Sequence, residues 1–454
     1  MWNYIKTSII ISVVLCLAAI AIVNSERSLA RDAEQWITVD RAELDAVAAL
    51  VRMADGGPAI NARVAREVDG IAFLRLNDEQ MEDLSRAMHE VFHKCGGFVR
   101  HASEAEAVAW VENLRTVDTD AALINYTIDN PATAPLVASA GELETRQGII
   151  DLAAFPNRRY NQPSGLESAN WIKDRWTQFS NARGNIASVE FFNHPANVSP
   201  QPSVVMTIRG TRFPDEVVIL GAHQDSINLS GQTLPAPGAD DDASGVACLT
   251  EIIRVLTAKV FRPERTVKFM AYAAEEVGLR GSDAIAASYR AANTNVVGVL
   301  QLDMTNYRGT QGVDISMITD FTNAAQNQFI RDLITTYQPG LLVTNSTCGY
   351  ACSDHASWNN RNYPASFPFE APFGNDNPFI HTANDTLAQS NNNANHALRF
   401  TKLGISYVTE LAKGCISPRT PCPIGPVGKA PLSTLELTHS KTASGSLLLD
   451  ASSF

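Results

Sequence analysis

The sequence predicts an α/β fold in which helices sandwich a mixed, mostly parallel central sheet, and three observations support this prediction. Residues 217–220 (VVIL) form a wholly apolar run, as expected of a strand that is buried on both faces. Apolar residues within 246–260 are spaced three and four apart, which places them in one stripe along a helix. Strand patterns at 266–271 and 296–302 then flank a helical pattern at 282–292. Such alternation is typical of parallel strands covered by helices.

The bulk composition is that of a globular protein. The chain has 454 residues, of which 45% are hydrophobic and 19% charged, so there is ample material for a sizeable core. The formal net charge of -12 argues against nucleic acid or an anionic membrane as the main partner.

The first 30 residues have the pattern of a signal peptide. Lys6 supplies a positive charge, residues 8–23 form an uncharged apolar run, and residues 28–30 (SLA) place small side chains where a signal peptidase cleaves. A membrane anchor is the alternative, because an uncharged run of roughly 18 residues can begin to span a bilayer. We predict a signal peptide at 1–30, secretion to the extracellular space or the periplasm, and no stable membrane association after cleavage.

The rest of the chain divides into three predicted segments. Residues 31–128 form a small α+β region, with a strand at 36–40, a charged helix at 78–93, and an irregular, exposed and cleavable connection beginning at its end, over 128–141. We expect a catalytic domain at 129–414. Residues 415–454 are rich in Pro, Ser, Thr and Gly, which predicts a poorly ordered tail.

Cysteine spacing agrees with export. Two close pairs, Cys348 with Cys352 and Cys415 with Cys422, invite disulfides in an oxidising compartment. Cys95 and Cys248 have no evident partner and are expected to be buried thiols.

Acidic and imidazole residues are concentrated where the predicted strands end. The segments are GAHQDS at 221–226, PGADDDASG at 237–245, AYAAEEVGLRGS at 271–282, LQLDMTNY at 300–307 and IHTANDT at 380–386. In open α/β sheets, ligands bind outside the carboxyl ends of the strands. We therefore expect these side chains to meet at one edge of the sheet.

Two histidines with three or more carboxylates suit zinc and related divalent ions. Two such ions need a bridging carboxylate, and they can share and acidify one water molecule. A carboxylate that is not a ligand can then accept the water's proton and deliver it to a leaving amine. The adjacent Glu275 and Glu276 could supply one carboxylate of each kind. Each motif alone is more often a solvated loop, a helix start or surface charge, so the prediction rests on their combination.

The same segments carry a resemblance to a known family. APGADDDASG, FMAYAAEEVGLRGS, LQLDMTNY and TCGYACSDHASW closely resemble the bacterial leucyl aminopeptidases, which are secreted exopeptidases with a pair of zinc ions. The resemblance covers about 140–414 and implies the zinc exopeptidase fold. MHEVFHKCGGFVRH at 88–101 resembles the family's N-terminal propeptide.

The resemblance implies a role for individual residues. It implies that His223 and Asp303 bind one zinc ion and that Glu276 and His381 bind the other. Asp241 would bridge the two ions, with a cis peptide bond following it. It also implies that Glu275 is the general base and acid and that Asp225 orients His223. Tyr350 would stabilise the oxygen of the tetrahedral intermediate, and a disulfide between Cys348 and Cys352 would hold Tyr350 in place.

The substrate pocket can also be carried over. Met304, Ile318, Phe369 and Phe373 match apolar pocket positions, which implies a preference for Leu, Phe or Met at the substrate's N-terminus. Phe367 stands where methionine is usual, and Asp376 stands where an aromatic residue is expected. Either departure could change pocket depth or the tolerance for polar and basic side chains.

The predicted function is that of a secreted, monomeric metallo-aminopeptidase acting on peptides with a free N-terminus. A water or hydroxide bridging two zinc ions would attack, and a processing protease would remove the propeptide. His355 is expected to be structural, and His89, His93 and His101 to be unrelated to catalysis. Alternatives are another reaction on the same scaffold (carboxypeptidase action, deacylation of amino acids or glutaminyl cyclisation) and a binding module that has lost its metals.

Overall fold

The computed structural model describes residues 34–417, apart from 52–57, 93, 95, 102, 116–123, 182–185, 196 and 310–311. The predicted signal peptide and most of the predicted C-terminal tail lie outside the described residues, as do His93, Cys95 and Cys422. Within the described part of the chain, no helix is long and apolar enough to cross a membrane.

An eight-stranded sheet forms the centre of the main body, in the order β12-β11-β13-β10-β7-β9-β6-β5. The four neighbouring strands β13, β10, β7 and β9 are parallel, while β6 pairs antiparallel with β9 and β11 pairs antiparallel with β13. The sheet is therefore mixed with a parallel centre, as predicted. Its strands are β5 (Ser188–Phe192), β6 (Ser203–Ile208), β7 (Phe213–His223), β9 (Arg265–Tyr272), β10 (Asn295–Gln301), β11 (Ile315–Ile318), β12 (Val343–Ser346) and β13 (Ala365–Phe369).

Helices cover both faces of this sheet because successive residues of the central strands point to opposite sides. Val218 and Leu220 of β7 belong to the larger apolar core, and Val217 and Ile219 belong to a second core on the other face. The larger core contains residues of α5 (Thr133–Val137), α6 (Glu142–Ala153), α7 (Pro163–Asn181), α8 (Ala243–Ala258), α10 (Ala324–Tyr337) and α12 (Ala397–Ala412). The second core contains residues of α9 (Arg280–Ala291) and α11 (His355–Asn359). A short ribbon of β8 (Phe261–Pro263) and β14 (Gly414–Ile416) completes the body.

The predicted core elements are confirmed with small shifts at their ends. The predicted strands correspond to β7, β9 and β10, and the predicted helices correspond to α8 and α9. Helix α8 begins at the Asp242 cap, whose carboxylate accepts a hydrogen bond from the Gly245 N–H at 2.8 Å. It ends before Val260, whose φ of 53° turns the chain toward β8.

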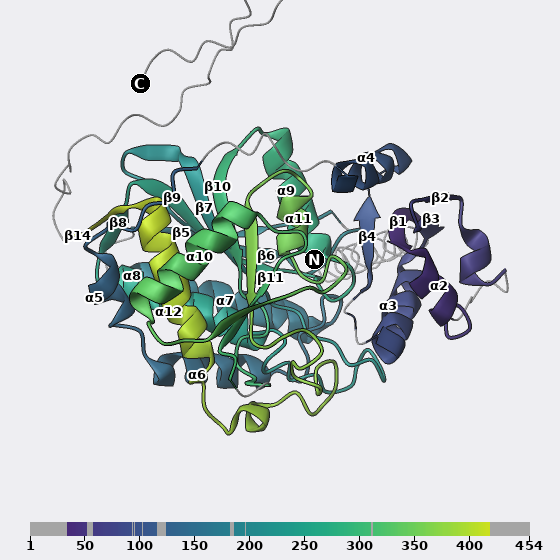
Figure 1. Cartoon of the computed structure of the whole chain (residues 1–454). Coiled ribbons are helices and arrows are strands. Elements are labelled where there is room, and N and C mark those ends of the chain that lie inside the picture. Colours follow the sequence, from purple (N-terminus) through teal and green to yellow (C-terminus); the bar gives the residue numbers. More distant parts are fainter. Residues whose placement is uncertain are drawn as a thin grey trace, which may run out of the picture.

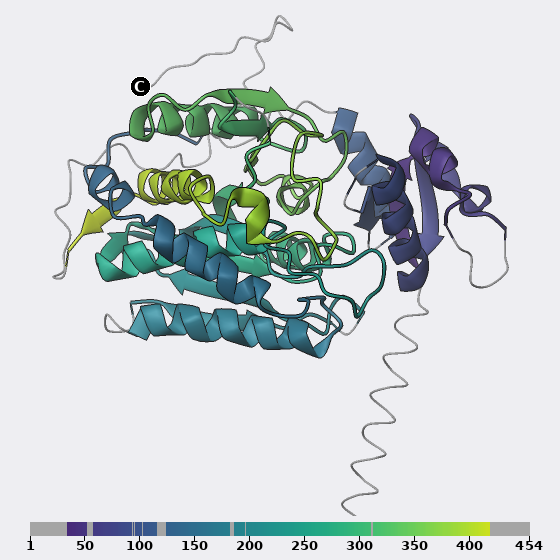
Figure 2. The ribbon, with the colours of Figure 1, turned by 90° about the horizontal axis from the view of Figure 1, so that it is seen from below.

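The N-terminal region is a small α+β unit with its own core. Its antiparallel sheet has the order β2-β3-β1-β4, with α2 and α3 contributing to one apolar cluster and α4 to another. Figures 1 and 2 show this region, in purple and dark blue, as a separate lobe beside the main body. Its elements are β1 (Gln35–Asp40), α2 (Arg41–Val47), β2 (Arg66–Val68), β3 (Ile71–Leu76), α3 (Asp78–Phe92), β4 (Phe98–His101) and α4 (Glu104–Arg115).

The expected exposed connection at 128–141 differs in the structure. It contains helix α5, and Leu136 within it is fully buried. The buried carboxylate of Glu410 on α12 accepts hydrogen bonds from the Asn130 N–H at 3.0 Å and from the Thr133 hydroxyl at 2.8 Å. This segment is therefore part of the packed main body, and the expectation of an exposed connection there is wrong.

Candidate metal centre

The predicted site residues meet at the carboxyl edge of the central sheet. His223 is the last residue of β7, and Asp241 immediately precedes the cap of α8. Glu275 and Glu276 follow the end of β9, and Asp303 follows the end of β10. His381 comes from the long loop after β13. All six are 5% exposed or less, so the whole cluster is buried.

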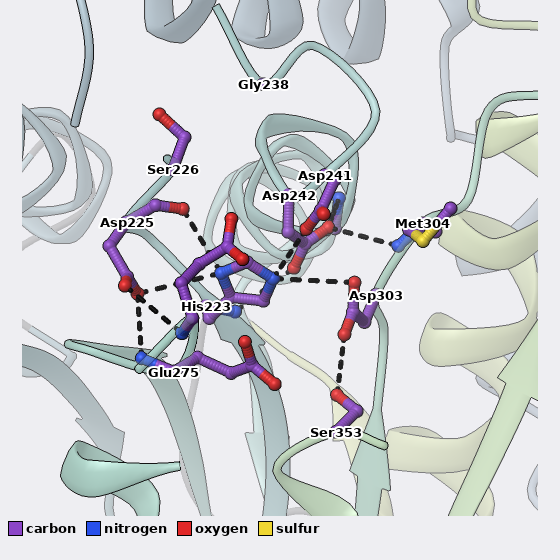
Figure 3. Close-up of polar contacts among 12 residues, drawn as sticks. His223, Asp225, Ser226, Gly238, Asp241, Asp242, Glu275, Asp303, Met304 and Ser353 are labelled. Carbon is purple, nitrogen blue, oxygen red and sulfur yellow. Dashed lines mark hydrogen bonds and ion pairs between the residues drawn. The ribbon is translucent and has the colours of Figure 1, made fainter. Parts of the chain in front are cut away.

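Two groups of potential metal ligands share Asp241. One contains His223, Asp241 and Asp303, and the other contains Asp241, Glu276 and His381. Nε2 of His223 lies 2.9 Å from Oδ1 of Asp241, whereas Nε2 of His381 lies 3.0 Å from Oδ2 of the same carboxylate. Figure 3 shows Asp241 and Asp303 facing the same edge of the His223 ring. Asp241 thus has the geometry of a carboxylate that could bridge two cations.

The candidate ligand atoms lie near or below the spacing that a bound zinc ion would give them, so they are close enough to share a cation. Two ligand atoms that each lie about 2.0–2.2 Å from a zinc ion are roughly 3.3 Å apart across a tetrahedral angle. Nε2 of His223 is 3.5 Å from Oδ1 of Asp303, and Nε2 of His381 is 2.7 Å from Oε2 of Glu276. Among the described residues, the buried oxygens Asp241 Oδ2, Glu276 Oε1, Glu276 Oε2 and Asp303 Oδ1 have no partner in hydrogen-bond geometry. Buried carboxylate oxygens of this kind are costly unless a cation or a proton neutralises them, and together with two histidines they form a donor set that fits zinc ions.

The loop that carries Asp241 is held by two neighbouring carboxylates. Asp385 accepts hydrogen bonds from the backbone N–H groups of Asp240 and Asp241, both at 3.1 Å. Asp242 accepts from the backbone N–H of His223 at 3.0 Å and from that of Met304 at 3.3 Å. It thereby ties together the ends of β7 and β10 and the start of α8. The peptide bond between Asp241 and Asp242 is cis, as the resemblance implies.

Close approach of α8 to the end of β10 requires a glycine. A Cβ atom on Gly245 would lie 2.1 Å from the carbonyl oxygen of Leu302, which no side chain allows. The glycine of the ADDDASG segment therefore lets the Asp241 loop and the Asp303 strand end share one edge.

Asp225 contacts both the histidine and the glutamate pair. Nδ1 of His223 lies 3.2 Å from the carbonyl oxygen of Asp225 and 3.6 Å from its Oδ1. The same carboxylate accepts from the backbone N–H groups of Glu275 at 3.0 Å and Glu276 at 3.3 Å. Figure 3 shows Asp225 beside His223 and Glu275, with dashed contacts from its carboxylate to both. Asp225 can therefore orient the His223 ring, as predicted, and it also fixes the turn that carries both glutamates.

Glu275 has the environment of a proton acceptor. Burial raises the pKa of its carboxyl group well above the usual range, the His223 side chain lowers it, and Asp354 and Asp303 raise it further. Its side chain lines the cavity beside His223, Asp241 and Asp303. Perturbed carboxylates in a cleft are typical of general acids and bases.

A small cavity opens beside the centre. It is lined by Met304, Phe367, Phe369 and Phe373 from the expected substrate pocket, together with Tyr350 and Asp376. Ile318 is not among the lining residues, although it is fully buried in the same apolar cluster as its cross-strand partner Phe367. The Cys348–Cys352 disulfide lies in the same apolar cluster as Tyr350.

The remaining sequence predictions have mixed outcomes. Cys248 is a buried free thiol, as expected, whereas Cys95 and the Cys415–Cys422 pairing depend on residues outside the described ones. His355 is fully buried and packs against Phe367, in agreement with a structural role. His101 is also buried, with Nε2 2.8 Å from the Thr38 hydroxyl.

Three contacts of the centre are absent from the sequence-based predictions. Ser353 donates a hydrogen bond to Oδ2 of Asp303 at 2.6 Å. Arg158 is fully buried behind the centre and donates to the carbonyl oxygens of Gln224 and Gly238, both at 2.9 Å. Nδ1 of His89 in the N-terminal region lies 3.1 Å from Nδ1 of His381. SDHASW could have suggested Ser353, but no local pattern marks Arg158 or His89.

The fold is α/β with a mixed central sheet, and a buried cluster of histidines and carboxylates lies at the carboxyl edge of that sheet. This combination is typical of metal-dependent hydrolases. The model of peptidase family M28 matches residues 203–405. Leucine aminopeptidase 1 of Penicillium rubens is 38% identical over 291 residues, which span 61% of this chain and 74% of that protein. Leucine aminopeptidase 1 of Ajellomyces capsulatus is also 38% identical, over 290 residues that span 61% of this chain and 73% of that protein.

Solved structures agree with this assignment. LapB from Legionella pneumophila has a TM-score of 0.71 and 27% sequence identity, covering 84% of this chain and 100% of that one. The LapA aminopeptidase from the same organism has a TM-score of 0.69 and 26% identity, covering 84% and 98%. Both matches cover 84% of this chain, whereas the main body and everything after it, from residue 124 onward, make up less than three quarters. Both matches therefore extend into the N-terminal region. The chain belongs to peptidase family M28, and it is a zinc-dependent aminopeptidase, as the sequence predicts.

Replacing Asp225 tests how the centre is supported. Asp225→Asn substitutes an amide for the carboxylate that faces His223 and accepts the Glu275 and Glu276 N–H groups. We expect zinc affinity to fall by about 10- to 100-fold, as for other partners of metal ligands. Chelator competition would measure this, with Asp332→Asn on the exposed side of α10 as the control. An unchanged affinity would show that Asp225 does not support the centre.

Proposed function

We propose that the chain is a secreted, monomeric aminopeptidase that uses two zinc ions to release N-terminal residues, preferentially large apolar ones such as Leu. The observation that carries the two-ion proposal is the Asp241 carboxylate, whose two oxygens each face a different histidine. The relatives named leucine aminopeptidase and the apolar cavity beside the centre support the substrate preference.

The two groups of side chains suggest how the ions would be divided. His223 and Asp303 would hold one ion, Glu276 and His381 would hold the other, and Asp241 would contact both. When bound, zinc polarises a carbonyl group and acidifies water, so that a nucleophile is available near neutral pH.

The chain's own residues would move the proton and place the substrate. Glu275 lines the cavity without belonging to either ligand group, so it would take a proton from the attacking water and return it to the leaving amine. The Tyr350 hydroxyl would donate to the oxygen of the tetrahedral intermediate. Phe367, Phe369 and Phe373 would hold the N-terminal side chain of the substrate, with Asp376 at the same cavity allowing some basic character.

Secretion and processing complete the proposal. The signal pattern at 1–30 and the Cys348–Cys352 disulfide support an oxidising, extracellular location. The N-terminal region of 31–128 would act as a propeptide that assists folding or inhibits the enzyme until a processing protease removes it. Its contacts with the main body, including that between His89 and His381, support this role.

Two substitutions should separate the proton carrier from the bridging ligand. Glu275→Ala should keep both zinc ions but lower kcat by about 10²- to 10⁴-fold, because general acid–base catalysis is lost. Asp241→Ala should lose zinc, because the carboxylate shared by the two groups is removed. Elemental analysis beside kinetics would test both. Normal turnover in Glu275→Ala, or two zinc ions in Asp241→Ala, would contradict the assignments.

A substrate panel tests the reaction type and the pocket. Leu-p-nitroanilide should be hydrolysed well, together with the Phe and Met compounds, because their side chains match an apolar cavity. An N-blocked Leu compound should be inert, since the proposed reaction needs a free N-terminus. Comparable turnover of blocked or C-terminal substrates would favour an acylase or carboxypeptidase instead, and formation of pyroglutamate would indicate a cyclase.

Expression with and without residues 31–128 tests the propeptide role. We expect a chain beginning near residue 129 to fold in lower yield, or to be more active per folded molecule, than the chain that retains the region. Refolding yield and kcat/KM for Leu-p-nitroanilide would distinguish assistance from inhibition. Equal yield and equal activity in both forms would remove the propeptide proposal.

A further inference from the structure

Helix α3 of the N-terminal region docks on the main body through buried charge pairs. Arg280 contacts Asp78 with both terminal nitrogens, at 3.0 Å and 3.1 Å, and its side chain is 1% exposed. Arg159 contacts Glu82 at 2.9 Å with 6% of its side chain exposed. Separating such a buried pair is strongly destabilising, because it leaves a buried charge without its partner. They therefore fix the position of α3 on the main body.

His89 lies on the side of α3 that these acids define. Asp78, Glu82 and His89 are separated by four and seven residues, a spacing that places them along one helix face. At the far end of this face, the His89 and His381 ring centroids are 4.5 Å apart, and Nδ1 of one ring lies 3.1 Å from Nδ1 of the other. The docked helix thus delivers an imidazole to one of the candidate zinc ligands.

The two nitrogens of His381 face different partners. Nε2 is the atom within 3.0 Å of Asp241 and Glu276, on the proposed metal side, and Nδ1 is the atom that meets His89. An imidazole that offers Nε2 to a metal carries its proton on Nδ1, and metal-bound histidines almost always donate that proton to a neighbouring group. In this arrangement, Nδ1–H of His381 donates and Nδ1 of His89 accepts.

We infer that His89 is a positioning residue for the zinc ligand His381, so that the N-terminal region contributes to the metal centre. This inference rests on the two-zinc function proposed above. His89 would do for His381 what Asp225 does for His223, by fixing the ring orientation and the tautomer. One difference is that Asp225 belongs to the loop directly after His223, whereas His89 comes from 292 residues away in the sequence. Docking of the N-terminal region would therefore favour occupancy of the zinc site that contains His381.

Zinc affinity of the full chain tests the role of His89. His89→Ala removes the acceptor, whereas in His89→Asn the side-chain oxygen takes the place of Nδ1 and can still accept from His381. We expect His89→Ala to bind one of its two zinc ions about 10- to 100-fold more weakly and His89→Asn to bind both nearly as tightly as the unmodified chain. Glu90→Ala, an exposed neighbour on α3, is the matched control and should retain both ions. The measurements are zinc content after dialysis against graded chelator and thermal unfolding of each variant.

The outcomes separate this inference from the function on which it rests. Selective loss of one ion in His89→Ala, with recovery in His89→Asn, supports the positioning role. Two ions held by His89→Ala as tightly as by the unmodified chain would overturn it and leave the two-zinc function intact. Equal losses in both variants, or loss of both ions together with a lower unfolding temperature, would also overturn it, because they indicate disrupted packing. Failure of the unmodified chain to bind two zinc ions would overturn both proposals.

Discussion

Concentrated negative charge buried at one edge of the sheet is the constraint on which the rest of this structure depends. The carboxyl groups around the centre are each 5% exposed or less: Asp225, Asp240, Asp241, Asp242, Glu275, Glu276, Asp303, Asp354 and Asp385. Burial, and after it the neighbouring carboxylates, raise the pKa of Glu276 to about 7 and that of Asp385 to about 8. Without cations such a cluster would favour protonation over charge. The fully buried Arg158, whose guanidinium interacts with several of these acids, supplies one compensating charge, and zinc ions would supply the rest.

That constraint also explains the local backbone. Ala274, Met304 and His381 adopt left-handed φ angles of 54°, 51° and 57°, which non-glycine residues rarely take. Each of them is a candidate ligand or the immediate neighbour of Glu275 or Asp303, so these turns occur where side chains are directed into the centre. Such conformations persist only where the surroundings determine them fully. Asp225 and Asp242 help to hold these turns in place, because they accept hydrogen bonds from the backbone N–H groups of Glu275 and Met304.

The sequence predicts features that depend on neighbouring residues better than features that depend on contacts between distant segments of the chain. Apolar runs such as 217–220 report burial directly, and the order of strand and helix then brings the strand ends to one edge. Spacing alone could not choose Asp241 among three adjacent aspartates, because that choice depends on which carboxylate faces both histidines. The two prolines of segment 128–141 predict an irregular chain, whereas contacts with Glu410 in the distant helix α12 hold the segment against the main body. Which apolar side chains line the cavity depends on packing in the same way: Ile318 lies in the same buried cluster as Phe367, yet only Phe367 is among the lining residues.

The contact between His89 and His381 joins residues that are 292 positions apart, so local sequence patterns could not predict it. MHEVFH contains two histidines in a segment that is predicted to be helical, a pattern that is common on surfaces and carries no indication of a partner. Only the docking of α3, fixed by Arg280 and Arg159 on the main body, brings one of them to the centre. The N-terminal region therefore meets the main body in two ways, through charge pairs that set its position and through an imidazole that reaches a candidate ligand. A change in the position of α3 on the main body would therefore also change the surroundings of His381.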